Sequence, residues 1–248
     1  AALQELPFGL YYGGVDTTPL FVMLAGAYAE RTGDLSFIDE IWPALERATA
    51  WIEKEGDSDG DGLIDYLRGA ETGLANQGWK DSSDSIFHAD GSDPQGAIAL
   101  VEVQGYCYAA LVAMAGIAER RNQFEAAARW QRSAERLRGL VEERFWLEEK
   151  NFYALAVDGS GRPCAVRASN AGHLLYTGLP GAHRARHIIN QLLAPDFASG
   201  WGARTLALGE ARYNPMSYHN GSVWPHDSAL CVAGMARYGE RAGVVQMM

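Results

Sequence analysis

The sequence is poor in cysteine and in positive charge, and neither forms a pattern that would build a site. Its 248 residues include three cysteines, Cys107, Cys164 and Cys231, with no C-x-x-C spacing. That number and spacing argue against a disulfide framework and against a zinc site. Lysine and arginine total 21 against 31 acidic residues, a net charge of −10, and they form no block. Without a basic patch to neutralise phosphates, a nucleic-acid partner is not expected.

The sequence also lacks the segments that direct a chain to a membrane. No apolar run reaches transmembrane length, and no leader pattern opens the chain. We therefore expect no membrane partner and a cytoplasmic location. Apolar residues are nevertheless abundant, at 48 % of the chain, which suffices for the core of one large domain or two small ones.

Apolar residues recur at helical spacing in seven segments. The predicted helices are residues 17–32, 35–55, 96–121, 122–148, 170–178, 183–193 and 221–240. The second of them contains Pro43, where a break is expected because proline lacks the backbone N–H that the helix needs. We therefore predict an all-α fold.

Charge alternates from one predicted helix to the next. The first, third, fifth and seventh helices are poor in charge away from their ends, whereas the second, fourth and sixth are amphipathic. Short turns such as "TGD", "RRN" and "LPG" join the members of a pair, and long connections separate the pairs. This pattern predicts a series of αα-hairpins, each with an inner and an outer helix. All the long connections, and the segment "FGLYYGGVD", should then lie at one end of the array.

The rim of the array is formed by the long connections, the segment before the first helix and the N-terminal ends of the inner helices. It carries aromatic, carboxylate, amide and imidazole side chains. They are Tyr11, Tyr12, Asp16, Trp79, Asp81, Asp84, His173, Trp201, Tyr218, His219, Asn220 and Trp224. Aromatic faces stack on the C–H face of a sugar, and the polar groups can bind its hydroxyls. A tryptophan beside a carboxyl group can also desolvate it, which is one way to make a general acid. The rim therefore indicates a glycoside, whose hydrolysis needs two carboxyl groups.

Several blocks of the sequence carry a family resemblance. "FGLYYGGVDTTPLF", "ANQGWKDSSDSIFHADG", "ALVEVQGYCYAA", "SNAGHLLYTGL", "SGWGARTLA" and "YNPMSYHNGSVWPHDSAL" resemble successive blocks of the bacterial amylo-α-1,6-glucosidase family, of the glycogen-debranching type. That family is related to the glucoamylase and trehalase group. The resemblance covers nearly the whole chain. It implies an (α/α)6 toroid of six helical hairpins, an inverting mechanism, and an α-glucan or α-glucoside substrate. It also implies that Asp81 is the general acid, with Asp84 as the local competitor.

Two blocks of the family pattern are missing. Neither a "GRDG"-like block upstream nor a "PELFCG"-like block downstream, whose glutamate resembles the catalytic base, occurs here. Seven helices also fall short of the twelve in a closed toroid. We therefore expect residues 1–248 to be one glycosidase domain, a central fragment of a longer chain, with the base beyond Met248. Asp227 is the fallback for the base within this chain.

The candidate substrate-binding residues extend beyond the acid. They are Asp16, Trp79, Asp84, Glu102, His173, Trp201, Arg204, His219, Asn220 and Trp224.

Most of these candidates have a plain structural alternative. Asp81 could cap a helix or close a turn, and Asp16 could be the N-cap of the first helix. Glu102 could pair with a buried arginine, and His173 could satisfy backbone groups. The tryptophans at 201 and 224 could be packing plugs, and Lys80 could be only a solvated loop charge.

The acidic stretch "DSDGDGLID", residues 57–65, resembles the first half of a calcium loop. Asp57, Asp59, Asp61 and Asp65 stand at ligand spacing, but the twelfth position is Arg68 instead of the bidentate glutamate. A turn rich in side-chain-to-backbone hydrogen bonds is the preferred interpretation. No cofactor is therefore expected, and calcium remains the alternative.

Two other functions stay open. The same architecture could hydrolyse a small glucoside such as trehalose, or a sugar-acid glycoside, in a closed pocket. Alternatively, the chain could be a truncated fragment that binds glycans without hydrolysing them.

Overall fold

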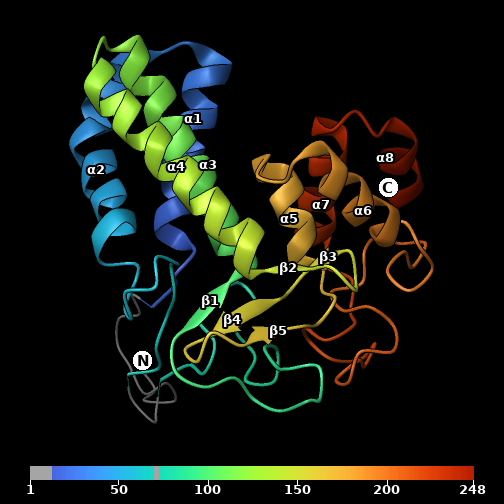
Figure 1. The fold of residues 1–248 in the computed structure, drawn as a ribbon. Helices are drawn as coiled ribbons and strands as arrows, with labels where there is room; N and C mark the ends of the chain where they lie inside the picture. The colour runs from blue at the N-terminus through green and yellow to red at the C-terminus, as the bar shows by residue number, and fades with distance from the viewer. Residues whose placement is uncertain (1–12, 70–72) are drawn as a thin grey trace, which may run out of the picture.

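The computed structural model describes residues 13–69 and 73–248, so Tyr11, Tyr12 and most of the segment before the first helix lie outside the described residues. The described residues form eight helices (Figure 1). Their bounds are α1 Thr17–Thr32, α2 Leu35–Lys54, α3 Val101–Arg120, α4 Phe124–Arg144, α5 Asn170–Thr177, α6 Ala182–Leu192, α7 Pro225–Arg237 and α8 Arg241–Met247.

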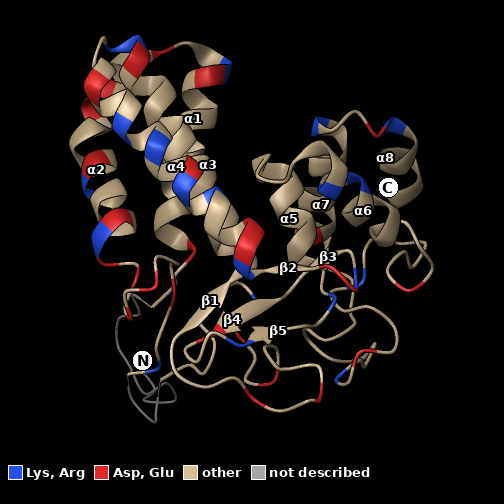
Figure 2. Ribbon diagram, viewed as in Figure 1, with Lys and Arg blue, Asp and Glu red and all other residues tan. Residues whose placement is uncertain are grey.

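The helices pack as hairpins arranged side by side. The members of each pair contact each other: α1 with α2, α3 with α4, α5 with α6, and α7 with α8. The odd-numbered helices also contact one another in order, α1 with α3, α3 with α5, and α5 with α7. Figure 2 shows charged residues along the outer helices α2 and α4, whereas α3 and α5 have few of them. The charge alternation therefore predicted correctly which helices face the core.

Several helix boundaries differ from expectation. Helix α3 begins at Val101 and not at residue 96, because Ile98–Leu100 is a strand, and α4 ends at Arg144 and not at residue 148, because Trp146–Leu147 is a strand. Pro43 lies inside α2 without ending it. The last inner helix begins at Pro225 and not at residue 221, because Gly221 has φ 141°, which no helix accommodates, and proline is favoured at the first helical position. Helix α8 is an element that the sequence interpretation did not anticipate.

The prediction of an all-α fold is corrected by short strands. The described residues contain β1 Ile98–Leu100, β2 Trp146–Leu147, β3 Phe152–Tyr153, β4 Ala156–Asp158 and β5 Pro163–Cys164. Strands β1, β4 and β5 form an antiparallel sheet, and β2 pairs with β3. The connection "AVDGSGRPC" is therefore a β-hairpin, and its Asp-Gly turn was the available signal. The sheet lies at the end of the array where α3 begins (Figure 1).

The central helix of the array is α3. It is long and apolar enough to cross a membrane by length and composition, so the expectation that no segment reaches that length is wrong. Of its apolar window, 72 % is buried inside the fold, as is typical of a core helix. The three cysteines are free and buried, in agreement with the absence of a disulfide framework in the described residues.

The contact between α5 and α7 yields a stability prediction, because it depends on a glycine. A Cβ at Gly234 would lie 2.5 Å from Leu175 Cβ and 2.6 Å from the backbone nitrogen of Tyr176. Gly234→Ala should therefore lower the free energy of unfolding by about 1–3 kcal/mol through overpacking. Gly139 in α4 is the control, because a Cβ there meets nothing within 4 Å. Gly139→Ala should raise the free energy by up to about 1 kcal/mol through helix propensity. Urea unfolding measures both, and equal signs would contradict this view of the interface.

Candidate functional site

The loop of residues 76–85 is fixed from within by its own side chains. The Asn76 side-chain amide donates to the backbone carbonyl of Ser82 at 2.7 Å and accepts from the Tyr66 hydroxyl at 2.8 Å. The Ser85 hydroxyl donates to the carbonyls of Lys80, at 2.6 Å, and Ser82, at 2.8 Å. These bonds hold the backbone of residues 80–85 in one conformation.

A second segment, just before α7, holds the same loop from outside. The Ser82 hydroxyl lies 2.8 Å from His219 Nδ1, and the Asn220 amide donates to the backbone carbonyl of Asp84 at 3.0 Å. Arg212 donates to that carbonyl as well, at 3.0 Å. His219 and Asn220 therefore hold the loop in place, and both are buried.

The fixed loop directs its side chains to opposite sides. Lys80 is fully buried, so the interpretation of Lys80 as a solvated loop charge is wrong. Its ammonium donates to the backbone carbonyl of Thr205 at 2.7 Å and lies 5.1 Å from the Trp79 ring centroid. Asp81 and Asp84 are exposed, and in the described part of the chain their carboxylates make no hydrogen bond or ion pair. Asp81 thus caps no helix, and its carboxyl group faces outward from a rigid support.

Three histidine rings contact Trp79. His173 stacks on it at 5.8 Å and 23°, while His219 and His226 meet it edge-on at 5.5 Å and 4.7 Å. Trp224 stacks in turn on His219 at 5.7 Å and 25°. Burial lowers the pKa of His219 to about 4, and also lowers that of His226, so both imidazoles are neutral at neutral pH.

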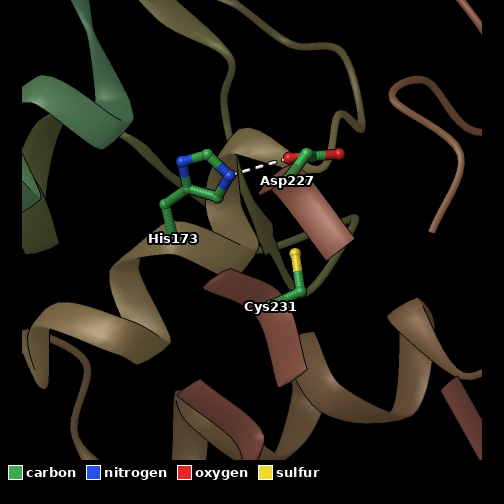
Figure 3. Close-up of side chains that lie close together, drawn as sticks. All are labelled: His173, Asp227 and Cys231. Carbon is green, nitrogen blue, oxygen red and sulfur yellow. Dashed lines mark hydrogen bonds and ion pairs between the residues drawn. The ribbon is translucent and has the colours of Figure 1, made fainter. Parts of the chain in front are cut away.

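Behind Trp79 lies a buried chain of three polar side chains. His173 Nδ1 is 2.6 Å from the Tyr106 hydroxyl, and its Nε2 is 2.7 Å from Asp227 Oδ1 (Figure 3). His173 therefore bonds to side chains, and not to the backbone groups that the structural alternative required. Asp227 is fully buried, so it does not face solvent as a base acting on water would.

Two further polar side chains lie in the same interior. Glu102 and Asn170 are both buried. They face each other, but the side-chain polar atoms of both residues have no hydrogen-bond partner within the described residues. Burial raises the pKa of Glu102, opposed by Asn170, His173 and Lys80. The sequence alternative of an arginine partner for Glu102 is not what the structure shows, because its neighbours are these three.

Asp16 joins this cluster from the start of α1. It occupies the N-cap position, yet its side chain makes no cap hydrogen bond. Burial raises the pKa of Asp16, and the backbone N–H of Trp79 acts against that rise. Asp16, loop 76–85, His173 and the segment before α7 thus converge at one end of the helices, as the long connections indicated.

His173, Asp227 and Cys231 are close enough to hold a metal ion, with ligand atoms within 4.8 Å of one another (Figure 3). The first two already bond to each other, and the positive charge of Lys80 acts on Asp227 and Cys231. Burial raises the pKa of the Cys231 thiol well above its usual range, and its Sγ lies 3.8 Å from the Ser169 carbonyl oxygen. The three side chains are thus engaged with groups of the protein itself.

The acidic loop has the hydrogen bonds of a turn. Both carboxylate oxygens of Asp57 accept backbone N–H groups, from Gly60 at 2.7 Å and Gly62 at 2.9 Å. Asp61 accepts from the backbone of Leu63 and pairs with Arg144 at 3.2 Å. Asp65 accepts from Ser58, and Asp59 from the backbone of Asp61.

These bonds predict no response to calcium. The carboxylates of Asp57, Asp59 and Asp61 lie together, but each already accepts a hydrogen bond. A ligand that binds only the folded state raises the melting temperature by mass action. We therefore expect the melting temperature to be the same with a chelator and with millimolar calcium. A rise of several degrees with calcium, but not with magnesium, would assign an ion to residues 57–65.

The remaining candidates lie on the loops around the site. Trp201 is 89 % exposed, so it is no packing plug in this chain, and Tyr218 is 61 % exposed. Trp224 is half-buried, and its indole N–H donates to the Tyr218 carbonyl at 2.7 Å. The Arg204 guanidinium donates to the backbone carbonyls of Pro195 and Phe197.

The sequence interpretation missed three residues of the buried cluster, Lys80, Tyr106 and Asn170, and the exposed His226 that meets Trp79 edge-on. Asn170 and Tyr106 resemble ordinary helix residues in the sequence, because only tertiary packing directs them inward. Lys80 had a signal, since a lysine between a tryptophan and an aspartate in a long loop is unusual for a plain connection.

Comparison with known proteins finds one matching family. A sequence profile described as "Mannosylglycerate hydrolase MGH1-like glycoside hydrolase domain" matches residues 12–248. Among curated proteins, none matches the sequence significantly.

Solved structures share the fold. The GH63 mannosylglycerate hydrolase from Thermus thermophilus, in complex with glucose, has a TM-score of 0.73 at 18 % identity, over 98 % of this chain and 68 % of that one. A sialidase chain has a TM-score of 0.71 at 18 % identity, over 91 % of this chain and 21 % of that one. A neutral trehalase from Saccharomyces cerevisiae has a TM-score of 0.52 at 14 % identity, over 58 % and 28 %. The chain thus has the fold of the (α/α)6 glycosidases over most of its length and is shorter than each of these proteins.

Proposed function

This chain belongs to the MGH1-like glycoside hydrolase family, and from that premise we propose that it contributes the general acid of an inverting glycosidase that acts on a small glycoside. The proposal names Asp81 as the acid. The observation that carries it is the exposed carboxyl group of Asp81, which projects from a loop held rigidly on both sides beside the aromatic cluster.

The geometry of the loop suits a proton donor. A general acid must be held in place relative to the leaving oxygen, because misplacement by a fraction of an ångström costs rate. The backbone of residues 80–85 is fixed by the bonds of Asn76, Ser85 and Asn220, while the Asp81 side chain stays free to meet a ligand. Trp79 supplies the neighbouring ring on which a sugar face can stack.

A structural neighbour supports a small substrate over a branched glucan. It is described as a GH63 mannosylglycerate hydrolase in complex with Tris and D-glycerate. We therefore place a sugar-acid glycoside first, and an α,α-linked disaccharide such as trehalose second.

A substrate panel tests this order in the full-length protein. Mannosylglycerate and glucosylglycerate, trehalose, isomaltose and a branched glucan are compared by kcat/KM, with the anomer of the released sugar followed by NMR. We expect the highest kcat/KM for a sugar-acid glycoside and inversion at the anomeric carbon. A preference for the branched glucan, or retention of configuration, would refute the proposal, and tight binding with no turnover of any member would favour a binding module.

The debranching α-1,6-glucosidase is kept as a second candidate because of two exposed rings. Trp201 and Tyr218 are exposed on the connection between α6 and α7, which lies at the same end of the helices as loop 76–85 (Figure 1). Exposed aromatic side chains of this kind could stack on the further sugars of a long chain. The branched glucan in the panel decides between a single-sugar pocket and an extended groove.

A further inference from the structure

Lys80 is the only buried lysine or arginine of residues 13–69 and 73–248. A charged ammonium is costly to bury unless it is paired and hydrogen-bonded. Lys80 has one hydrogen bond, to the Thr205 carbonyl at 2.7 Å, and two carboxylates act on it, those of Asp227 and Glu102. Its neighbour in the chain is Asp81, the proposed acid.

Thr205 is a junction in the fold. Its carbonyl accepts from Lys80 and from the backbone of Ser169, immediately before α5. Its backbone N–H donates to Ser222, and its hydroxyl accepts from Gly221, immediately before α7. A bond from Lys80 to this carbonyl therefore joins loop 76–85 to the points where two inner helices begin.

Two buried carboxylates, those of Glu102 and Asp227, both favour the charged form of the Lys80 ammonium. Glu102 lies at the start of α3 and Asp227 at the start of α7, and each leaves at least one carboxylate oxygen without a hydrogen bond in the described residues. Burial lowers the pKa of Lys80 to about 8, and the two carboxylates oppose that shift. Its position along the chain places it next to Asp81, whose side chain faces the opposite way.

We propose that Lys80 is a positioning residue for Asp81: its ammonium anchors loop 76–85 to the Thr205 carbonyl, and so fixes the outward-facing acid. This inference rests on the proposed role of Asp81. Lys80 acts through the loop and touches no substrate.

The test uses Lys80→Met in the full-length protein, with the best sugar-acid glycoside of the panel as substrate. Methionine keeps the length of the side chain and removes the ammonium. We expect kcat to fall about 100-fold with little change in KM, the size of effect that a displaced catalytic group produces. Lys150→Met is the matched control, because Lys150 also donates to a backbone carbonyl, that of Ala165 at 2.6 Å, away from the loop. Its kcat should stay within about twofold of the wild type.

The double variant Lys80→Met, Asp81→Asn separates positioning from general damage. If Lys80 acts only through the acid, the double variant should be no slower than Asp81→Asn alone, because effects of residues that act as a unit do not add. Losses that multiply would overturn the inference, as would wild-type kcat in a folded Lys80→Met protein. If Asp81→Asn itself retains full activity, the proposed role of Asp81 as the acid is refuted, whatever the Lys80 variants show.

Folding is checked by the melting temperature and by hydrogen exchange of residues 76–85. We expect faster exchange in that loop and unchanged exchange in α3 and α4. Should Lys80→Met not fold, Lys80→Gln, which keeps a donor without the charge, is put through the same double-variant comparison.

Discussion

Asp81→Asn is expected to lower kcat of the full-length protein by about two to four decades, the contribution that general acid catalysis typically makes. Asparagine keeps the shape of the side chain but carries no transferable proton. The exposed carboxyl group has no structural partner in the described residues, so the substitution should leave the fold intact. The loss should appear in kcat, with substrate binding largely kept.

Two comparisons isolate the acid in that experiment. A substrate with an excellent leaving group needs less protonation, so the loss for Asp81→Asn should shrink with it. Asp84→Asn is the matched control, since Asp84 lies exposed in the same loop and its backbone carbonyl, not its carboxylate, holds Asn220. Asp84→Asn should cost far less, and the opposite ranking would move the acid to Asp84. The partner carboxylate should lie about 6.5–9.5 Å from the acid, which leaves room for the attacking water.

His173→Phe is expected to lower the free energy of unfolding by about 3 kcal/mol, the upper end of the cost of leaving a buried hydrogen-bonding group unsatisfied. Asp227 Oδ1 bonds to His173 at 2.7 Å, and Oδ2 has no hydrogen bond in the described residues. Phenylalanine would therefore leave both oxygens of a fully buried carboxyl group without a hydrogen bond, which is why the upper end is expected.

A second buried pair provides the control. His88 Nε2 lies 3.0 Å from Asp158 Oδ2, but Asp158 also accepts from Ser160 and Arg162. Burial raises the pKa of Asp158, and these hydrogen bonds outweigh it, so the pKa is about 2. His88→Phe should therefore cost only about 1 kcal/mol, the net value of one hydrogen bond. Equal losses in urea unfolding of the two variants would mean that Asp227 is compensated in another way.

The helical part of the fold could be predicted because its signals are local. Residues 17–32 were expected as a helix, and α1 has those bounds. Glycine at 33 adopts φ 71° and ends the helix as its position indicated. The strands were missed because two or three residues have no detectable period, and their pairing, such as Ile98 with Asp158, joins segments far apart in the chain.

The candidate site likewise has features that the sequence predicts and features that only the structure shows. The sequence by itself determined a hairpin array with its long connections at one end, because helical periodicity, charge alternation and turn lengths are all read along the chain. It also singled out the Trp79–Asp81 loop as a place for chemistry. Only the tertiary structure decided that Lys80 turns inward and Asp81 outward, and that Asn170, Tyr106 and Asp227 gather behind Trp79. The physical reason is that burial and hydrogen bonding depend on partners more than a hundred residues away, such as Thr205 for Lys80, which no local pattern records.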